Sequence, residues 1–198
     1  MAIVWVCGLG VDAYHSLGRG IEVPRFDCPA CGLPMVFWGW YARYLRVESW
    51  CRQVSIRRQR CQACVISHAV LPSFVTYQRL DEVSVIGAGI EAMVAGAGSR
   101  GMAESLGLPH TTVRDWRRRF SRRAVLLAAG VAAVVVALTG SVDRLGADSE
   151  KAALSAMAAA WQSLASWGRV IGNAFVVANV ICGSHLLSTN TDPPWALA

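Results

Sequence analysis

The sequence predicts an α+β protein, mainly α, made of a small β zinc ribbon, a helix-turn-helix unit of three helices and an apolar helical C-terminal region. Three observations predict this class: two CxxC pairs separated by 29 residues, a helix-turn-helix pattern after them, and a remainder rich in Ala and Val. We expect four parts in chain order: an N-terminal segment (1–24), a zinc ribbon (25–72), a helix-turn-helix domain (80–123) and the apolar helical region (124–198).

The charge of the chain is concentrated in its middle. The 198 residues are 54% hydrophobic and 16% charged and carry a formal net charge of +6, a composition that excludes a largely disordered chain. Residues 25–123 hold 15 Arg against 7 acidic residues, a balance of +8, whereas each end of the chain has a balance of −1. A basic middle between nearly neutral ends favours a nucleic-acid partner.

Four of the seven cysteines have the spacing of a zinc site: Cys28, Cys31, Cys61 and Cys64. Each CxxC loop brings two thiolates to the same side of one ion, and Gly32 lets the backbone turn beneath it. Residues 35–41 and 54–60, between the pairs, have the composition or the alternation of strands. Four thiolates leave no open coordination position, so we expect structural Zn2+; the alternative is a set of buried or redox cysteines.

The remaining cysteines indicate the compartment. Cys7, Cys51 and Cys182 have no CxxC partner and are expected to be bystanders, and His68 is expected to stay outside the ligand set. The chain begins without the basic and long apolar stretches of a secretory signal, and its number of cysteines is odd. Both features predict reduced thiols and a cytoplasmic protein.

Residues 80–123 fit a helix-turn-helix position by position. Asp81 can cap a first helix whose apolar residues recur at steps of three and four up to Met93. With Gly107 on the turn between the next two helices, the positions that must be buried hold Met102, Ala103, Leu106, Leu108, Val113 and Trp116. Ser99 can cap the second helix, and Thr111 or Thr112 starts the third.

The third helix would enter the major groove of double-stranded DNA. Arg114 and Arg118, four residues apart on one face, are expected to read guanines, and the arginines around and after them are expected to contact phosphates. The alternative is a solvated helix face, but only one acidic residue lies among these arginines. The predicted DNA-binding set is His110, Thr111, Thr112, Arg114, Asp115, Arg117, Arg118, Arg119, Arg122 and Arg123.

Five stretches of the chain resemble an uncharacterised family from high-GC bacteria that carries a domain of unknown function: residues 23–43, 56–64, 67–73, 111–120 and 187–195. That family is in turn similar to the N-terminal DNA-binding region of insertion-sequence transposases, which joins a zinc ribbon to a helix-turn-helix. The resemblance implies DNA binding and an origin in mobile elements, and it implies no measured activity.

These features predict a sequence-specific DNA-binding protein, transposase-related or a transcriptional regulator, with no catalytic activity of its own. A transposase nuclease needs three acidic residues that hold two metal ions in a ribonuclease-H-like fold. Past residue 123 the acidic residues are Asp143, Asp148, Glu150 and Asp192, and 75 residues are too few for such a fold. The alternative is an accessory part of a transposition nuclease.

Residues 124–142 are 19 consecutive uncharged residues directly after a basic segment, which satisfies the length and charge rules for a membrane helix. Their many Ala and Gly residues gain little from lipid, so we expect a buried helix that packs on residues 152–167; the alternative is a membrane-anchored DNA-binding regulator. Residues 170–182 are too few to span a membrane. A homodimer is a further hypothesis, with core or dimer anchors at Trp161, Trp167 and Trp195.

Overall fold

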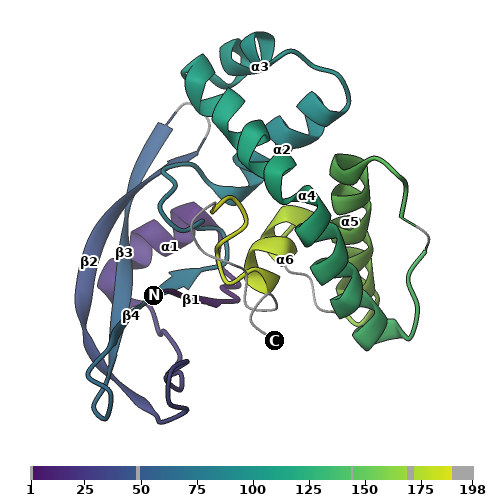
Figure 1. Cartoon of the computed structure of the whole chain (residues 1–198). Helices are drawn as coiled ribbons and strands as arrows, with labels where there is room; N and C mark the ends of the chain where they lie inside the picture. The colour runs from purple at the N-terminus through teal and green to yellow at the C-terminus, as the bar shows by residue number, and fades with distance from the viewer. Residues whose placement is uncertain (1, 48–49, 144, 169–171, 189–198) are drawn as a thin grey trace.

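The computed structural model describes residues 2–47, 50–143, 145–168 and 172–188, and it has the mixed α and β structure that the sequence predicts (Figure 1). Trp195 lies outside the described residues. A four-stranded sheet occupies one side, in the order β1 (Ala2–Trp5), β4 (Ser67–Pro72), β3 (Trp50–Cys61) and β2 (Met35–Val47). The helices of the other side are α2 (Val83–Val94), α3 (Ser99–Leu106), α4 (His110–Thr139), α5 (Ser149–Ser166) and α6 (Ala174–Ile181).

β2 and β3 form a long antiparallel arm. Its register runs from Met35 opposite Cys61 to Val47 opposite Trp50, with a bulge between Phe37 and Gly39. Both strands are longer than the sequence predicts, because the pairing continues through residues 42–47 and 50–53. The arm therefore reaches from one end of the sheet to the other (Figure 1).

The N-terminal segment is part of this sheet. β1 pairs in parallel with β4, and α1 (Val11–Leu17), which a short 3-10 turn η1 (Gly18–Gly20) follows, packs on β3. The buried Tyr14 hydroxyl donates a hydrogen bond to the carbonyl of Ser55 at 3.0 Å, and the Tyr14 ring meets Phe74 edge-on. Residues 2–23 and the predicted ribbon consequently share one apolar core.

α2 begins two residues after its predicted cap. Glu82 is the N-cap, and Asp81 instead forms an ion pair with Arg46 of β2, with 2.6 Å between Oδ1 and Nε. The Asp81 side chain is only 4% exposed. A carboxylate buried to this extent needs a cationic partner more than the helix needs a cap.

α4 is one continuous helix of 30 residues that crosses the predicted boundary between residues 123 and 124. It begins at His110, before the predicted start at Thr111 or Thr112. Its buried residues Phe120, Ala124 and Leu127 follow at steps of four and three, so the buried face continues without a break. The helix ends where Gly140 adopts a left-handed backbone, with φ of +83°.

The second half of α4 packs along α5, the neighbour that the sequence predicts for it (Figure 1). Ala153, Ala156 and Ala160 of α5 are fully buried, and small side chains let two helices approach closely. By length and composition α4 could also cross a membrane, because its most apolar 18 residues have a mean hydropathy of 1.8; 39% of them are buried in this structure. A core helix of a soluble protein has the same properties.

α6 joins the helices to the sheet. Asn179 is fully buried, and its Nδ2 donates to the carbonyls of Ser73 and Val75 at 3.0 Å each. Asn173 caps α6, since its Oδ1 accepts from the backbone N–H of Val176 at 3.1 Å. The two asparagines thus have structural roles within an otherwise apolar segment.

Gly87 and Gly89 mark close crossings of α2 with other helices. A Cβ atom at Gly87 would lie 2.6 Å from ring atoms of Phe175 in α6, and one at Gly89 would lie 3.2 Å from the ring of Trp116 in α4. Larger side chains at these positions would push the helices apart.

We expect Gly87→Ala to destabilise the protein by about 1 to 3 kcal/mol, because the methyl group meets Phe175 inside the core. Gly101→Ala is the matched control: it lies in α3 with open space around it and should gain up to about 1 kcal/mol from helix propensity. Urea unfolding of the two variants measures the difference. Equal stabilities of the two variants would contradict the close approach of α2 and α6 at Gly87.

Candidate metal centre and nucleic-acid interface

The four predicted zinc ligands lie together at one end of the β2–β3 arm, at the lower left of Figure 1. Their sulfur atoms are all within 4.8 Å of one another, and the shortest separations are 3.4 Å for Cys28–Cys64 and 3.5 Å for Cys31–Cys61. All four thiols are free of disulfide bonds. A tetrahedral ion with bonds of about 2.3 Å places its sulfur ligands about 3.8 Å apart, so the cluster could hold one metal ion.

Two tight loops at the end of the arm build the cluster. After Cys28, the N–H of Gly32 donates to the Cys28 carbonyl at 2.8 Å, and Gly32 has a φ of +73°, which only glycine adopts easily. In the second loop the N–H of Cys61 donates to the carbonyl of Ile66 at 2.9 Å. Because Met35 lies opposite Cys61, the register of the arm brings the two loops together.

The backbone favours one thiolate in the cluster. The N–H of Cys64, more than any other group, lowers the pKa of Cys61 to about 7, although burial opposes this shift. At Cys31 the N–H of Leu33 also lowers the pKa, but hydrogen bonds with Cys61 and the other thiols, together with burial, raise it to about 12. A soft divalent ion displaces such shared protons when it binds.

His68 lies beside the cluster. Its Nε2 is 3.7 Å from the sulfur of Cys28, and the side chain is fully buried, which lowers the pKa of the imidazole. At this distance the ring can hydrogen-bond to the Cys28 sulfur and support it. Cys7, Cys51 and Cys182 do not join the four-cysteine group.

α3 and α4 meet at the turn that the sequence places at Gly107. Gly107 has a left-handed backbone with φ of +63°, and the N–H of Leu108 donates to the carbonyl of Ala103 at 2.9 Å. Ser99 lies inside α3 and does not cap it; its hydroxyl is 3.0 Å from Nε2 of His110, which links the first turns of the two helices. The residues predicted to be buried here all belong to the helical core or pack against it: Met102, Ala103, Leu106, Leu108, Val113 and Trp116.

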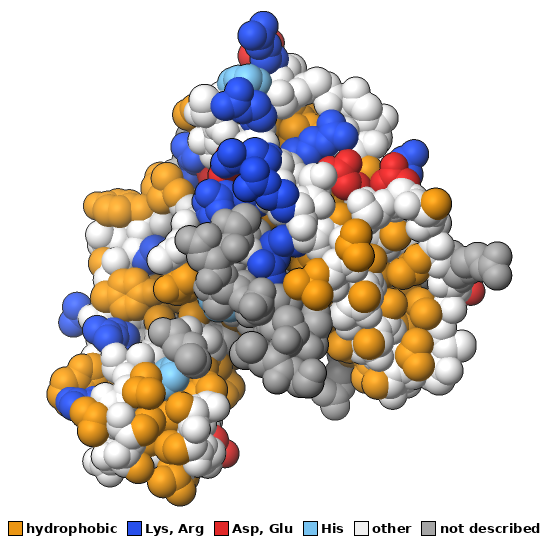
Figure 2. All heavy atoms as spheres, in the orientation of Figure 1, with side chains coloured by type: hydrophobic (Ala, Val, Ile, Leu, Met, Phe, Trp, Pro, Cys, Tyr) orange, Lys and Arg blue, Asp and Glu red, His pale blue; other side chains and the backbone are white. Residues whose placement is uncertain are grey.

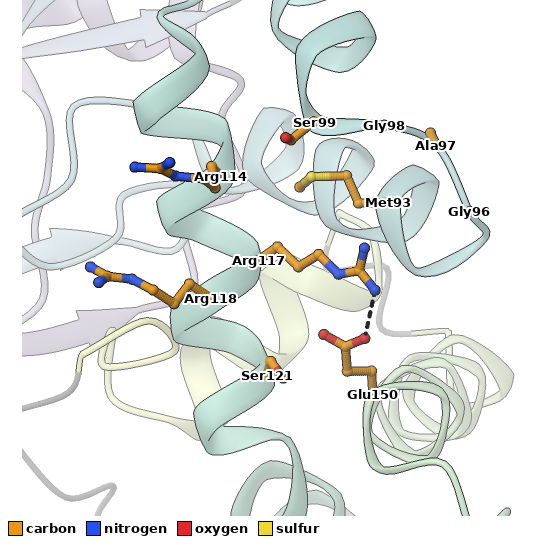
Figure 3. Close-up of a pocket in the computed structure, with 10 residues that line it drawn as sticks. All are labelled: Met93, Gly96, Ala97, Gly98, Ser99, Arg114, Arg117, Arg118, Ser121 and Glu150. Carbon is orange, nitrogen blue, oxygen red and sulfur yellow. Dashed lines mark hydrogen bonds and ion pairs between the residues drawn. The ribbon is translucent and has the colours of Figure 1, made fainter.

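Three exposed arginines form a row along α4: Arg114, Arg118 and Arg122. Residues four apart share one face of a helix, and the exposed Thr111 lies on the same face one turn earlier. Figure 3 shows Arg114 and Arg118 pointing away from α5 and from the loop between α2 and α3. Basic side chains gather over this end of the molecule in Figure 2. We call Thr111, Arg114, Arg118 and Arg122 the arginine row.

Arg117 points the other way. It borders a hollow of about 570 Å³ between α4, the α2–α3 loop and the start of α5, and its Nη2 lies 3.2 Å from the Glu150 carboxylate (Figure 3). The sequence shows both residues but not that they meet, because they are 33 positions apart.

Arg123 does not fit the phosphate contact predicted for it. Its side chain turns into the protein, the residue is 7% exposed, and the guanidinium donates to the carbonyl of Ser188. The helix period predicts that Arg123 lies on the buried face of α4, since position 123 is three residues after Phe120 and four before Leu127, both fully buried.

Asp115 forms ion pairs with two neighbouring arginines. Its carboxylate oxygens lie 2.5 Å from Nη2 of Arg118 and 2.5 Å from Nε of Arg119. Partial burial would raise the pKa of Asp115, but the hydrogen bonds from Arg119 and Arg118 outweigh it and hold the pKa below the usual value. Of the predicted DNA-binding set, Asp115, Arg119, His110 and Thr112 are half-buried.

Near the metal centre the structure pairs aromatic rings with arginines, and the sequence does not show this pairing. Cζ of Arg57 lies 4.1 Å from the ring centroid of Phe37 and 4.6 Å from that of Trp40. Cζ of Arg60 lies 4.4 Å above the ring of Trp38. An aromatic run at 37–41 and an arginine run at 57–60 are visible in the sequence, but only the strand register pairs them.

Residues 28–116 match the model of a family described as a domain of unknown function, DUF6431. The match begins at the first predicted zinc ligand and ends at Trp116, so it includes the cysteine cluster and the α3–α4 turn. No curated protein and no solved structure matches the chain.

Proposed function

We propose that this protein binds double-stranded DNA sequence-specifically through α4, as a transposase-related protein or a transcriptional regulator, and has no catalytic activity of its own. In this proposal α2, α3 and α4 are a helix-turn-helix, and the cysteine cluster holds a structural Zn2+ that fixes a zinc ribbon. The arginine row, on the helix that follows the Gly107 turn, is the observation that carries the proposal.

The dimensions of the row suit a major groove. The rise from Arg114 to Arg122 is eight steps of helix, about 12 Å, and a major groove about 12 Å wide admits an α-helix. The opposite face of α4 is held in the core by Trp116 and Phe120, so the row is presented on a rigid element. A guanidinium can donate two hydrogen bonds to one guanine, and later arginines can neutralise phosphates.

Four thiols in a closed group suit a structural ion better than a catalytic one, because four-coordinate zinc with four sulfur ligands has no place for water or substrate. Two of the acidic residues after α4 also have structural partners. Asp148 caps α5 by accepting from the N–H of Lys151 at 3.0 Å, and Glu150 pairs with Arg117. These pairings support the proposal that the chain has no nuclease activity.

The DNA contacts can be separated by substitution. We expect Arg114→Ala to cost about 1 to 3 kcal/mol on the preferred sequence and to relax the choice of base, whereas Arg122→Ala should weaken all duplexes alike and reduce the salt slope by about 1. The measurement is selection of bound fragments from a random duplex pool, followed by binding assays over a salt series. Arg117→Ala is the control, because its side chain points toward Glu150; binding that is absent at low salt would contradict the proposal.

We propose a cytoplasmic location, and the hydropathy of α4 favours a membrane-anchored regulator as the second candidate. Val125 of α4 is 72% exposed, so part of its apolar surface is uncovered in one copy of the chain. Flotation of the full chain with lipid vesicles distinguishes the two: a cytoplasmic protein stays in the dense fraction. Light scattering of that fraction tests whether the chain is the homodimer that the sequence suggests.

A further inference from the structure

We propose that the arm carries a second nucleic-acid site, beside the metal centre, that binds unpaired bases of single-stranded DNA. We call it the ribbon site and define it by Trp38 and Arg60 on one face of the arm and by Phe37, Arg57 and Arg25 on the other. The ribbon site goes beyond the proposed function, because both its surface and its ligand differ from those of α4.

The ribbon site begins with an exposed tryptophan. The bulge between Phe37 and Gly39 leaves Trp38 without a partner residue on β3, and the residue is 56% exposed. β2 is the outermost strand of the sheet, and residues 80–82 pair with its far end, at Arg46, away from Trp38. Trp38 and Arg60 border a hollow of about 310 Å³, together with Val36 and Val65. A large exposed apolar ring beside a hollow is a feature of binding surfaces.

Arginines accompany the rings. The guanidinium of Arg60 lies over Trp38, and that of Arg57 lies between Phe37 and Trp40. Arg25 adds a third guanidinium, 5.0 Å from the centroid of Phe37. A guanidinium that stacks on a ring keeps N–H groups for a phosphate.

This combination selects a single strand over a duplex. Bases of a duplex are stacked inside it, so an exposed indole on the end of an arm has no base face to meet. Unpaired bases stack on aromatic rings, and the phosphates between them pair with neighbouring arginines. Figure 2 shows hydrophobic and basic side chains mixed over this end of the arm, away from the basic side chains at the α3–α4 end.

The test is fluorescence anisotropy with a labelled oligothymidine of about 12 nucleotides, a length within the range that single-strand sites cover, and with a mixed-sequence duplex at the same salt concentration. We expect Trp38→Ala to weaken oligothymidine binding about 5- to 100-fold and to leave duplex binding within about twofold. Trp38→Phe should restore most of the affinity, since the ring still stacks. Tyr44→Ala is the matched control: Tyr44 lies on the same strand and is 60% exposed, outside the ribbon site.

The α4 variants separate this proposal from the previous one. Arg114→Ala should weaken duplex binding and spare oligothymidine binding, the reverse of Trp38→Ala. No oligothymidine binding by the native protein, or equal losses on both DNAs in Trp38→Ala, would overturn the ribbon site. A native protein that binds oligothymidine but no duplex would leave the ribbon site standing and overturn only the role of α4. Circular dichroism and zinc content, unchanged in Trp38→Ala, exclude an effect through folding.

Discussion

Cys61→Ser is expected to remove the metal from the protein and to unfold the end of the β2–β3 arm. Cys61 is fully buried at the end of β3, opposite Met35, where it joins the two loops of the cluster. A serine hydroxyl does not replace a thiolate as a zinc ligand, and metal-binding free energy in such a small unit is folding free energy. We expect zinc to fall from about one ion per chain to almost none, and the sheet to lose several kcal/mol of stability.

Cys51→Ser provides the control on the same strand. Cys51 is exposed and lies outside the four-cysteine group, so its replacement should leave zinc content unchanged and shift stability by less than about 0.5 kcal/mol. Elemental analysis and thermal unfolding followed by circular dichroism measure both quantities. A native protein purified without metal, or a Cys61→Ser protein as stable as Cys51→Ser, would contradict the proposed zinc site.

Trp116→Ala is expected to cost about 3 to 5 kcal/mol of stability and to abolish DNA binding with it. Trp116 is 2% exposed and lies over Gly89 of α2, near Leu106 of α3, so its indole fills the space where three helices meet. Its removal leaves a cavity and releases α4 from the two helices that hold the arginine row in place. Denaturant unfolding measures the stability, and duplex binding below the unfolding transition measures the function.

Trp167→Ala is the matched control, because Trp167 is 53% exposed at the end of α5. We expect a change of less than about 0.5 kcal/mol and unaltered DNA binding. If Trp116→Ala lost no more stability than Trp167→Ala, the packing described for α2, α3 and α4 would be wrong.

The sequence predicts local features of this protein well. The four cysteines meet because each pair is fixed by a loop of two residues, and a strand pairing is enough to bring the loops together. Gly107 is on a turn because a left-handed backbone favours glycine. The buried positions around Gly107 follow from the helix period, and residues 102–116 supply them in the predicted places.

Capping residues were predicted less well. Asp81 and Ser99 both belong to residue types that prefer helix N-termini, yet neither caps its helix. Asp81 instead forms an ion pair with Arg46, 35 positions earlier in the chain, and the Ser99 hydroxyl contacts the imidazole of His110. A local preference of about 1 kcal/mol is overridden when a distant partner offers a stronger contact.

The sequence alone determined which residue types this protein has at which spacing: a four-cysteine group, a glycine turn and a dense set of arginines. Only the tertiary structure decided how those arginines divide. Arg114, Arg118 and Arg122 face solvent, Arg117 meets Glu150, and Arg123 reaches the carbonyl of Ser188 across 65 positions of the chain. The physical reason is that a helix fixes the direction in which each side chain points, whereas the residues that pack on each face of the helix come from distant segments.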